Sequence, residues 1–224
     1  MNAARRGPEP VVRLVLTRER IVHAAVELIE RHGVDALSMR AVAAELGVAV
    51  MSLYNHVSNK AALLEGVAEY VVAGLDTVPS GTGDWRAEAR ALVRAFRTAA
   101  HEYPHAMRVV LTHSIDSTAA SRLAERSLAL AAEAGFRGAT AVRIVHTLMA
   151  YAVGSQLQAL WLGQLIDRVS EGPGMARVDP ARFPHVVASA SALLAHDPEA
   201  DFEFGLDLLI TAIERLVEPV DQST

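Results

Sequence analysis

Three histidines in the middle of the chain have the spacing closest to that of a metal site. His101 and His105 stand four residues apart, which places two ligands on one face of an uninterrupted helix, and His113 follows them. Pro104 lies between the first two and interrupts the helix, because proline has no backbone N–H and its ring clashes with the preceding turn. The two imidazoles therefore do not share a face. We expect no metal and no cofactor, and we expect these histidines to be polar or helix-end residues.

Catalytic chemistry also lacks a recognisable pattern. The chain has no cysteine, which excludes disulfides, thiolate zinc sites, iron–sulfur clusters and cysteine nucleophiles. Gly81-Thr82-Gly83 is a lone glycine pair, typical of a linker rather than of a phosphate-binding loop. No nucleophile stands in a pattern that pairs it with a base. We therefore do not expect an enzyme.

Composition places the chain among globular proteins. Of its 224 residues, 51% are hydrophobic and 21% are charged, enough for a sizeable core. No run of about 18 uncharged apolar residues occurs and the N-terminus lacks a signal-peptide core, so we expect a cytoplasmic protein without a membrane span. The net charge is −5, but residues 1–60 carry +2 and residues 61–224 carry −7. This split suggests a weakly basic head on an acidic body.

Apolar residues recur at helical spacing along most of the chain, and no segment sustains a period of two. We therefore predict an all-α fold. The clearest break is the segment from Pro79 to Gly83. The predicted N-caps are Thr17, Ser38, Asn59 or Ser58, and Asp84. Helices are expected at 18–32, 39–46, 50–56, 60–75, 84–103, 104–112, 117–135, 137–165, 181–195 (interrupted by Pro184) and 199–217.

Two of these helices are spaced to form a helix-turn-helix. The segments 38–46 and 50–56 are joined by a turn that contains Gly47, and such a turn requires a residue that tolerates left-handed backbone angles. Apolar residues lie behind both helices, and the outer face of the second helix is free to enter a major groove. The spacing alone also allows an ordinary helical hairpin inside a bundle.

The sequence here resembles the DNA-binding domain of the tetracycline-repressor (TetR) family. The resemblance depends on Leu37-Ser-Met-Arg-Ala-Val-Ala-Ala-Glu-Leu-Gly47, followed by Ser52-Leu-Tyr-Asn-His-Val-Ser-Asn-Lys-Ala-Ala-Leu-Leu64. It continues more weakly through Trp85 to Phe96, Glu133 to Phe136 and Phe202 to Ile210. It implies a homodimer with two DNA-reading heads, a ligand pocket in each body, and release of double-stranded DNA when the ligand binds.

The resemblance also implies roles for individual side chains. Arg40 occupies a base-reading position, where a guanidinium fork suits guanine O6 and N7. Val50, Met51 and Ser52 lie where the family reads bases, and the first two can contact only thymine methyls or groove shape. The predicted DNA-binding set is completed by Tyr54, His56 and Lys60 as phosphate contacts, by Asn55 as a base or phosphate contact, and by Ser38.

Structural roles compete with several of these assignments. Arg40 could contact phosphate or lie free on the surface, and Met51 could pack at the start of its helix. Tyr54 could be half-buried in the core, and His56 could cap the end of its helix.

In the body, the resemblance predicts a pocket without the metal site of the tetracycline repressors. Those proteins hold the drug as a metal chelate through a histidine in the helix that corresponds to residues 104–112. Ungapped alignment from Trp85 puts Val110 there, or Val109 with a one-residue slip, and neither side chain can bind a metal. Leu92 replaces an asparagine. His146 is predicted to be buried and hydrogen-bonded, with ligand contact as the alternative. The predicted ligand-binding residues are Asp76, Leu92, Phe96, Val110, His113 and Met149, which favour a small, largely apolar effector.

The last helix is apolar on more than one side. One side is expected to pack on its own body and the other on a partner. The long helix offers Ala141, Val145, Leu148, Ala152 and Gly154 for close contact, and the two helices doubled by symmetry predict a four-helix dimer interface. The predicted domains are a flexible arm (1–16), a helix-turn-helix domain (17–63), a ligand-binding and dimerisation domain (64–218) and a tail (219–224).

These expectations add up to a ligand-responsive DNA-binding transcriptional regulator. The reading we favour is a repressor that releases a palindromic operator when the effector binds. A transcriptional activator of the same fold and a helical protein-interaction module are the alternatives.

Overall fold

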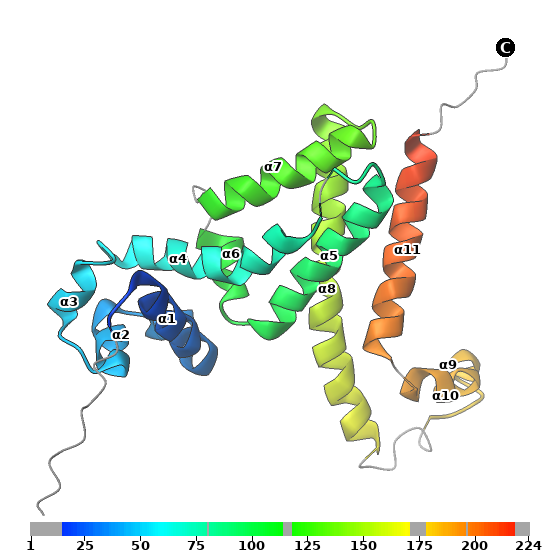
Figure 1. Ribbon diagram of the computed structural model, residues 1–224. Helices are drawn as coiled ribbons and strands as arrows, with labels where there is room; N and C mark the ends of the chain where they lie inside the picture. Colours follow the sequence, from blue (N-terminus) through cyan, green and yellow to red (C-terminus); the bar gives the residue numbers. More distant parts are fainter. Residues whose placement is uncertain (1–14, 80, 114–117, 171–177, 196, 218–224) are drawn as a thin grey trace, which may run out of the picture.

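The computed structural model describes residues 15–79, 81–113, 118–170, 178–195 and 197–217, and every regular element in these ranges is helical. This confirms the all-α prediction. Figure 1 shows α1 (Arg18–His32), α2 (Met39–Leu46) and α3 (Val50–Tyr54) at one end of the molecule, with α4 (Lys60–Val72) leading from them to the remaining helices. We call residues 15–63 the head and residues 64–217 the body. The predicted tail, most of the predicted arm and residues 171–177, between the helices predicted at 137–165 and 181–195, lie outside the described residues.

The helices of the head match the expected segments closely. Side-chain oxygens cap three of them: Thr17 Oγ1 accepts from Arg20 N at 3.2 Å, Ser38 Oγ accepts from Ala41 N at 3.1 Å and Asn59 Oδ1 accepts from Ala62 N at 2.8 Å. Asn59, not Ser58, is therefore the cap of the fourth helix. The elements are α1 (Arg18–His32), η1 (Val34–Ala36), α2 (Met39–Leu46), α3 (Val50–Tyr54), α4 (Lys60–Val72) and η2 (Ala73–Thr77).

The body is a set of longer helices around α8, which contacts α5, α7 and α11. Asp84 caps the first of them as predicted, because its Oδ1 accepts from Arg86 N at 3.1 Å. The elements are α5 (Trp85–Glu102), α6 (Met107–His113), α7 (Thr118–Glu133), α8 (Gly138–Ser170), α9 (Pro184–Ala188), α10 (Ala190–Leu194) and α11 (Pro198–Val217).

Several helix boundaries differ from prediction. The fourth helix was expected to reach Leu75, but α4 ends at Val72 and continues as the 3₁₀ segment η2. The helix α6 begins at Met107 rather than Pro104, and α8 extends to Ser170. Pro184 begins α9 rather than interrupting a helix, because the missing proline N–H has no intrahelical partner in a first turn.

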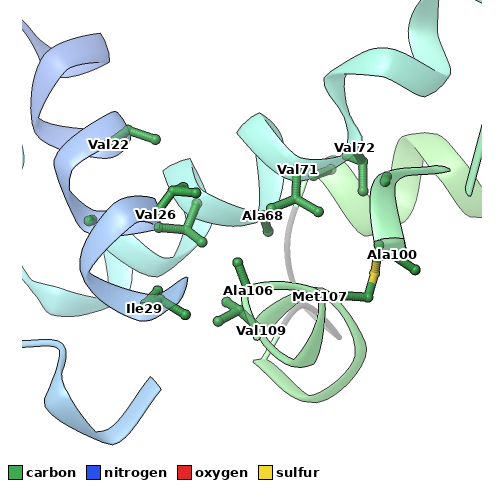
Figure 2. Packing of buried hydrophobic residues seen from close by; sticks show 14 of the residues in the cluster. Val22, Val26, Ile29, Ala68, Val71, Val72, Ala100, Ala106, Met107 and Val109 are labelled. Carbon is green, nitrogen blue, oxygen red and sulfur yellow. The ribbon is translucent and has the colours of Figure 1, made fainter. Parts of the chain in front are cut away.

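One hydrophobic core runs from the head into the body. Figure 2 shows its junction, where Val26 and Ile29 of α1 and Val71 of α4 face Ala106 and Val109 at the start of α6. Ala106 and Val109 are completely buried. Because α6 belongs to the body, the head and the body pack against each other as one apolar unit.

Ion pairs fasten α11 along α5. The arginines recur every three or four residues, so they lie on one face of α5. Arg94 makes two bonds to Glu203, at 2.6 and 2.5 Å, and this pairing lowers the pKa of the Glu203 carboxyl. The pairs are Arg86–Glu214, Arg90–Asp207, Arg94–Glu203 and Arg97–Glu199.

Two expectations about α8 are wrong. His146 is exposed, not buried. Ala141 and Ala152, expected at a dimer interface, are buried in their own body at 4% and 1% exposure. Among the α8 side chains that the structure describes, the large apolar ones that are exposed are instead Val142, Leu157 and Trp161. The error arises because a helix that is apolar on several sides gives no sequence signal for which side faces its own body.

Candidate nucleic-acid interface and ligand cavity

The predicted helix-turn-helix is present, and its turn has the expected backbone. Gly47 adopts left-handed angles (φ 65°, ψ 31°), and its N–H bonds back to the carbonyl oxygens of Ala43 and Ala44. Val42 on α2 and Leu53 on α3 are completely buried between the two helices. This packing fixes which face of α3 remains available to another molecule.

The face of α3 opposite Leu53 is exposed. Met51 is 72% exposed and Tyr54 is 43% exposed, and Asn55 is also exposed. Val50 and Ser52 are half-buried and flank this face. Met51 therefore does not pack at the start of its helix, which was the structural alternative for it.

Two cations stand beside α3 without a carboxylate partner among the described residues. Arg40 on α2 and Lys60 at the start of α4 are both exposed, whereas Arg18 and Arg31 are paired with Glu69 and Glu45. Lys60 has no acidic residue in its helical turn, so free amides and an ammonium group coincide there. Such a helix start favours an anion.

The remaining predicted DNA-binding side chains lie on the same elements. The hydroxyl oxygen of Ser38 accepts the capping bond of α2, which leaves its O–H able to donate. His56 is exposed in the turn between α3 and α4. The nine predicted residues thus lie on α2 with its N-cap, on α3, in the turn that follows α3, and at the start of α4.

The body contains a cavity of about 70 Å³ whose lining is almost entirely apolar. Ser127 supplies the one polar side chain among the lining residues, and its hydroxyl donates to Leu123 O at 2.8 Å. Three predicted ligand-binding residues line it: Leu92, Phe96 and Met149. The lining residues that sequence reasoning missed include Leu75, Trp85, Phe136, Leu130, Ile144 and Ile213.

The other predicted ligand-binding residues are not brought into this cavity. The Asp76 carboxylate lies 3.7 Å from the Arg122 guanidinium and is largely exposed. Val110 is half-buried against the core but is not a lining residue. The side chain of His113, at the end of α6, lies outside the described part of the chain. Within that part, no group of three histidine, aspartate or glutamate side chains is arranged to hold a metal ion.

A buried carboxylate shapes the loop beside the cavity. Glu88 accepts hydrogen bonds from Gly81 N at 3.2 Å, Thr82 N at 2.5 Å and Thr82 Oγ1 at 2.8 Å. The Thr82 hydroxyl and the two amides lower the pKa of Glu88, and the nearby Arg126 charge acts in the same direction. The segment read as a linker is therefore held in place by a charged side chain of α5.

Comparison with known protein families covers both parts of the chain. The profile of the bacterial regulatory proteins of the tetR family matches residues 21–67, which contain the helix-turn-helix. The profile of the tetracyclin repressor-like C-terminal domain matches residues 79–217.

The chain belongs to the TetR family. Among its relatives, the HTH-type transcriptional repressor DrrR1 of Streptomyces coeruleorubidus is 31% identical, over 95% of this chain and 81% of that protein. The class A tetracycline repressor of transposon 1721 from Escherichia coli is 31% identical, over 87% of this chain and 89% of the repressor.

Solved TetR-family structures share the whole architecture. The Streptomyces coelicolor protein ActR in complex with (S)-DNPA superimposes with a TM-score of 0.68 at 26% identity, over 88% of this chain and 96% of ActR. The family consists of DNA-binding regulators that respond to small-molecule effectors. The chain is therefore a ligand-responsive, DNA-binding regulator of transcription. No helix in the described ranges is long and apolar enough to cross a membrane.

Proposed function

We propose that this TetR-family protein is a dimeric repressor that leaves a palindromic operator when a small, largely apolar effector enters its body. The proposal rests on the two ends of the segment formed by α4 and η2. Lys60 begins α4 on the surface that carries α3, and Leu75 lines the cavity just after α4 ends. One continuous segment therefore connects the cavity with the DNA-facing surface.

The chemistry of the cavity sets the class of effector. Its walls offer aliphatic and aromatic carbon from Leu92, Phe96, Trp85 and Phe136, with no charged side chain among the lining residues. A charged metal chelate would lose its hydration there without compensation, at a cost of several kcal/mol. An apolar ligand gains about 25 cal/mol for each Å² that it buries. We therefore expect an apolar effector bound without metal.

The cavity is too small for a drug-sized effector, so the effector can bind only if the side chains that line the cavity move. A drug-sized ligand needs roughly 300 Å³ or more, whereas the closed cavity holds about 70 Å³. A second hollow of about 330 Å³ shares Leu92 and Leu130 with it, so displacement of these two side chains would join the two spaces. A ligand that binds only the widened form of the body shifts the protein toward that form. If the widened form does not bind DNA, the ligand thereby releases the protein from its operator.

The outer faces of α8 and α11 supply the dimer contact in this proposal. Phe204, Leu208 and Leu216 on α11 are each more than half exposed, and so are Leu157 and Trp161 on α8. Two such faces related by a two-fold axis would bury one another and set two heads one groove repeat apart, about 34–36 Å. Since an operator is DNA inside the cell, we place the protein in the cytoplasm.

The test begins with selection of bound DNA from a random pool, which should yield an inverted repeat. Affinity for that DNA should fall steeply with salt, because the contacts include phosphates. Release should follow addition of members of a panel of apolar metabolites, with or without a chelator. A shallow salt dependence and no selected sequence would favour a protein-interaction module. Release by tetracycline with magnesium that a chelator abolishes would restore the metal site and contradict the effector class.

A reporter gene behind the selected operator decides the sign of regulation. Repression requires expression to rise when the effector is added or the regulator is deleted. A fall in expression on deletion would identify an activator.

A further inference from the structure

The outermost line of α3 is formed by two side chains of different chemistry, Met51 within the helix and Asn55 at its C-cap, where the backbone is still helical (φ −69°, ψ −17°). Leu53 is completely buried and fixes the inward direction of the helix. At 3.6 residues per turn, Met51 and Asn55 each point within about 20° of the opposite direction. Both are exposed, whereas Val50 and Ser52 at the flanks are half-buried. Figure 1 shows α3 at the end of the head that is remote from the body.

Exposed apolar surface in the head is concentrated on this helix. Among the described residues of the head, the large apolar or aromatic side chains that are exposed are Val15, Met51 and Tyr54, and two of these lie on α3. Asn55 makes no side-chain hydrogen bond within the described ranges, so its amide is free to donate and to accept. The line thus presents one unpartnered thioether chain and one unpartnered amide.

We propose that Met51 and Asn55 recognise A·T base pairs in each operator half-site, an inference that rests on the proposed function. Met51 contacts the C5-methyl group of thymine, the one apolar group that a base edge displays in the major groove. Asn55 forms two hydrogen bonds with adenine: its Nδ2–H donates to N7, and its Oδ1 accepts from N6–H.

Neither side chain suits a G·C pair. Cytosine has no methyl group and would place its N4–H donor against the Met51 side chain, where the donor loses water without a new partner. Guanine presents acceptors at both O6 and N7, so Asn55 Oδ1 would face an oxygen that cannot donate. The A·T preference therefore comes from rejection of G·C as well as from contact with A·T.

The experiment removes single groups from the bases of the selected operator. Deoxyuridine in place of thymidine deletes only the C5-methyl, and 7-deazaadenine deletes only the N7 acceptor. At one thymine in each half-site we expect deoxyuridine to weaken binding about fourfold, equivalent to about 0.8 kcal/mol for one buried methyl. At one adenine we expect 7-deazaadenine to weaken binding by about 2- to 12-fold.

Variants assign each effect to its side chain. In Met51→Ala the deoxyuridine penalty should vanish while the 7-deazaadenine penalty remains, and in Asn55→Ala the reverse should hold. Tyr54→Phe, on the same helix, should retain both penalties. The proposal is wrong if no thymine is sensitive to loss of its methyl, or if Met51→Ala keeps the full penalty. If Asn55→Ala weakens binding to all DNA sequences equally, Asn55 contacts phosphate and does not recognise adenine. Failure to select any DNA would overturn the proposed function, which is a distinct result.

Discussion

The Glu30 carboxylate at the end of α1 accepts hydrogen bonds from the backbone amides of His105 and Ala106, at 3.3 and 2.7 Å. In return, His105 Nδ1 donates to the Glu30 carbonyl oxygen at 2.8 Å. The two residues therefore bind each other in both directions across the junction of head and body. The contact lies beside the apolar packing of Ala106 and Val109, so it orients α6 against α1.

Glu30→Ala should destabilise the protein by about 1–2 kcal/mol, because two amides at a helix start lose their acceptor. Urea unfolding followed by circular dichroism measures this loss. Glu27→Ala on the same helix is the matched control. Glu27 is exposed, and its contact with His23, at 3.7 Å, is an exposed surface pair. Surface pairs of this kind contribute little, so the loss of Glu27 should cost at most about 0.5 kcal/mol. Equal losses in the two variants would refute the capping role.

Gly66→Ala should be destabilising by about 1–3 kcal/mol despite its better helix propensity. A Cβ at Gly66 would lie 2.6 Å from Val22 Cγ2, and Val22 is buried and stiff about χ1. Gly74→Ala is the control, because a Cβ there meets no atom within 4 Å. It should be neutral or stabilising. In the double variant Val22→Ala/Gly66→Ala the clash is removed, so Gly66→Ala should cost less stability in the Val22→Ala background than in the wild type. An equal cost in both backgrounds, measured by urea unfolding, would show that the clash is not the cause.

The stability contributed by Glu88 should depend on acid pH. Its pKa is lowered in the folded protein, first by the Thr82 hydroxyl. The contribution is therefore fully present above the ordinary glutamate pKa of about 4.3, and it is lost as the pH falls through the lowered value. Urea midpoints of the wild type and Glu88→Gln should differ near neutral pH and converge in acid.

Thr82→Val serves as a control for this effect. Without the hydroxyl donor the pKa of Glu88 is lowered less, so the loss of stability in acid should be smaller and should be complete at a higher pH than in the wild type. Wild-type and Glu88→Gln curves that remain parallel over the whole range would show that Glu88 does not titrate differently on folding.

Arg40→Ala and Lys60→Ala should affect DNA binding in different ways. Arg40→Ala should cost about 1–3 kcal/mol for each half-site and relax the preference at one base pair. Lys60→Ala should weaken all sequences alike and reduce the salt slope by about 1. Binding titrations at several salt concentrations, on the operator and on single-base variants, measure both effects. Arg31→Ala, which removes a cation already paired with Glu45, should change neither. A sequence-selective effect of Lys60→Ala alone would reverse the two roles.

Leu208→Glu should convert the dimer to a monomer of 24.0 kDa, because a charge would be buried in the proposed contact of α11. Light scattering at micromolar protein concentration gives the mass directly. Met51→Glu places the same charge on another exposed apolar position and should remain dimeric. A wild type that is already monomeric under these conditions would remove the physical basis for a palindromic operator.

Local sequence was sufficient for much of the head. The caps at Thr17, Ser38 and Asn59 and the left-handed turn at Gly47 depend on interactions within a few residues of the chain. Such interactions are the same wherever the segment lies, so residue type predicts them. The resemblance carried by the same segment also placed the predicted DNA-binding residues on elements that the fold brings together.

Long-range packing decided the rest. The apolar residues of α8 gave no indication that Ala141 and Ala152 face inward while Leu157 and Trp161 face outward. Likewise Trp85 and Ile213 line one cavity although they are far apart in the chain. A helix with apolar residues on several sides is compatible with more than one orientation, and only the simultaneous packing of all its neighbours selects one.

The sequence by itself determined that the chain is all-α, where the helices of its head begin, and that a helix-turn-helix of the TetR type stands near its start. Only the tertiary structure decided that Glu30 meets His105, that Val110 lies outside the cavity and that Met51 and Asn55 share the outermost line of α3. The physical reason is that caps and turns depend on neighbours in sequence. The direction of a side chain depends on which face of its helix the rest of the molecule buries.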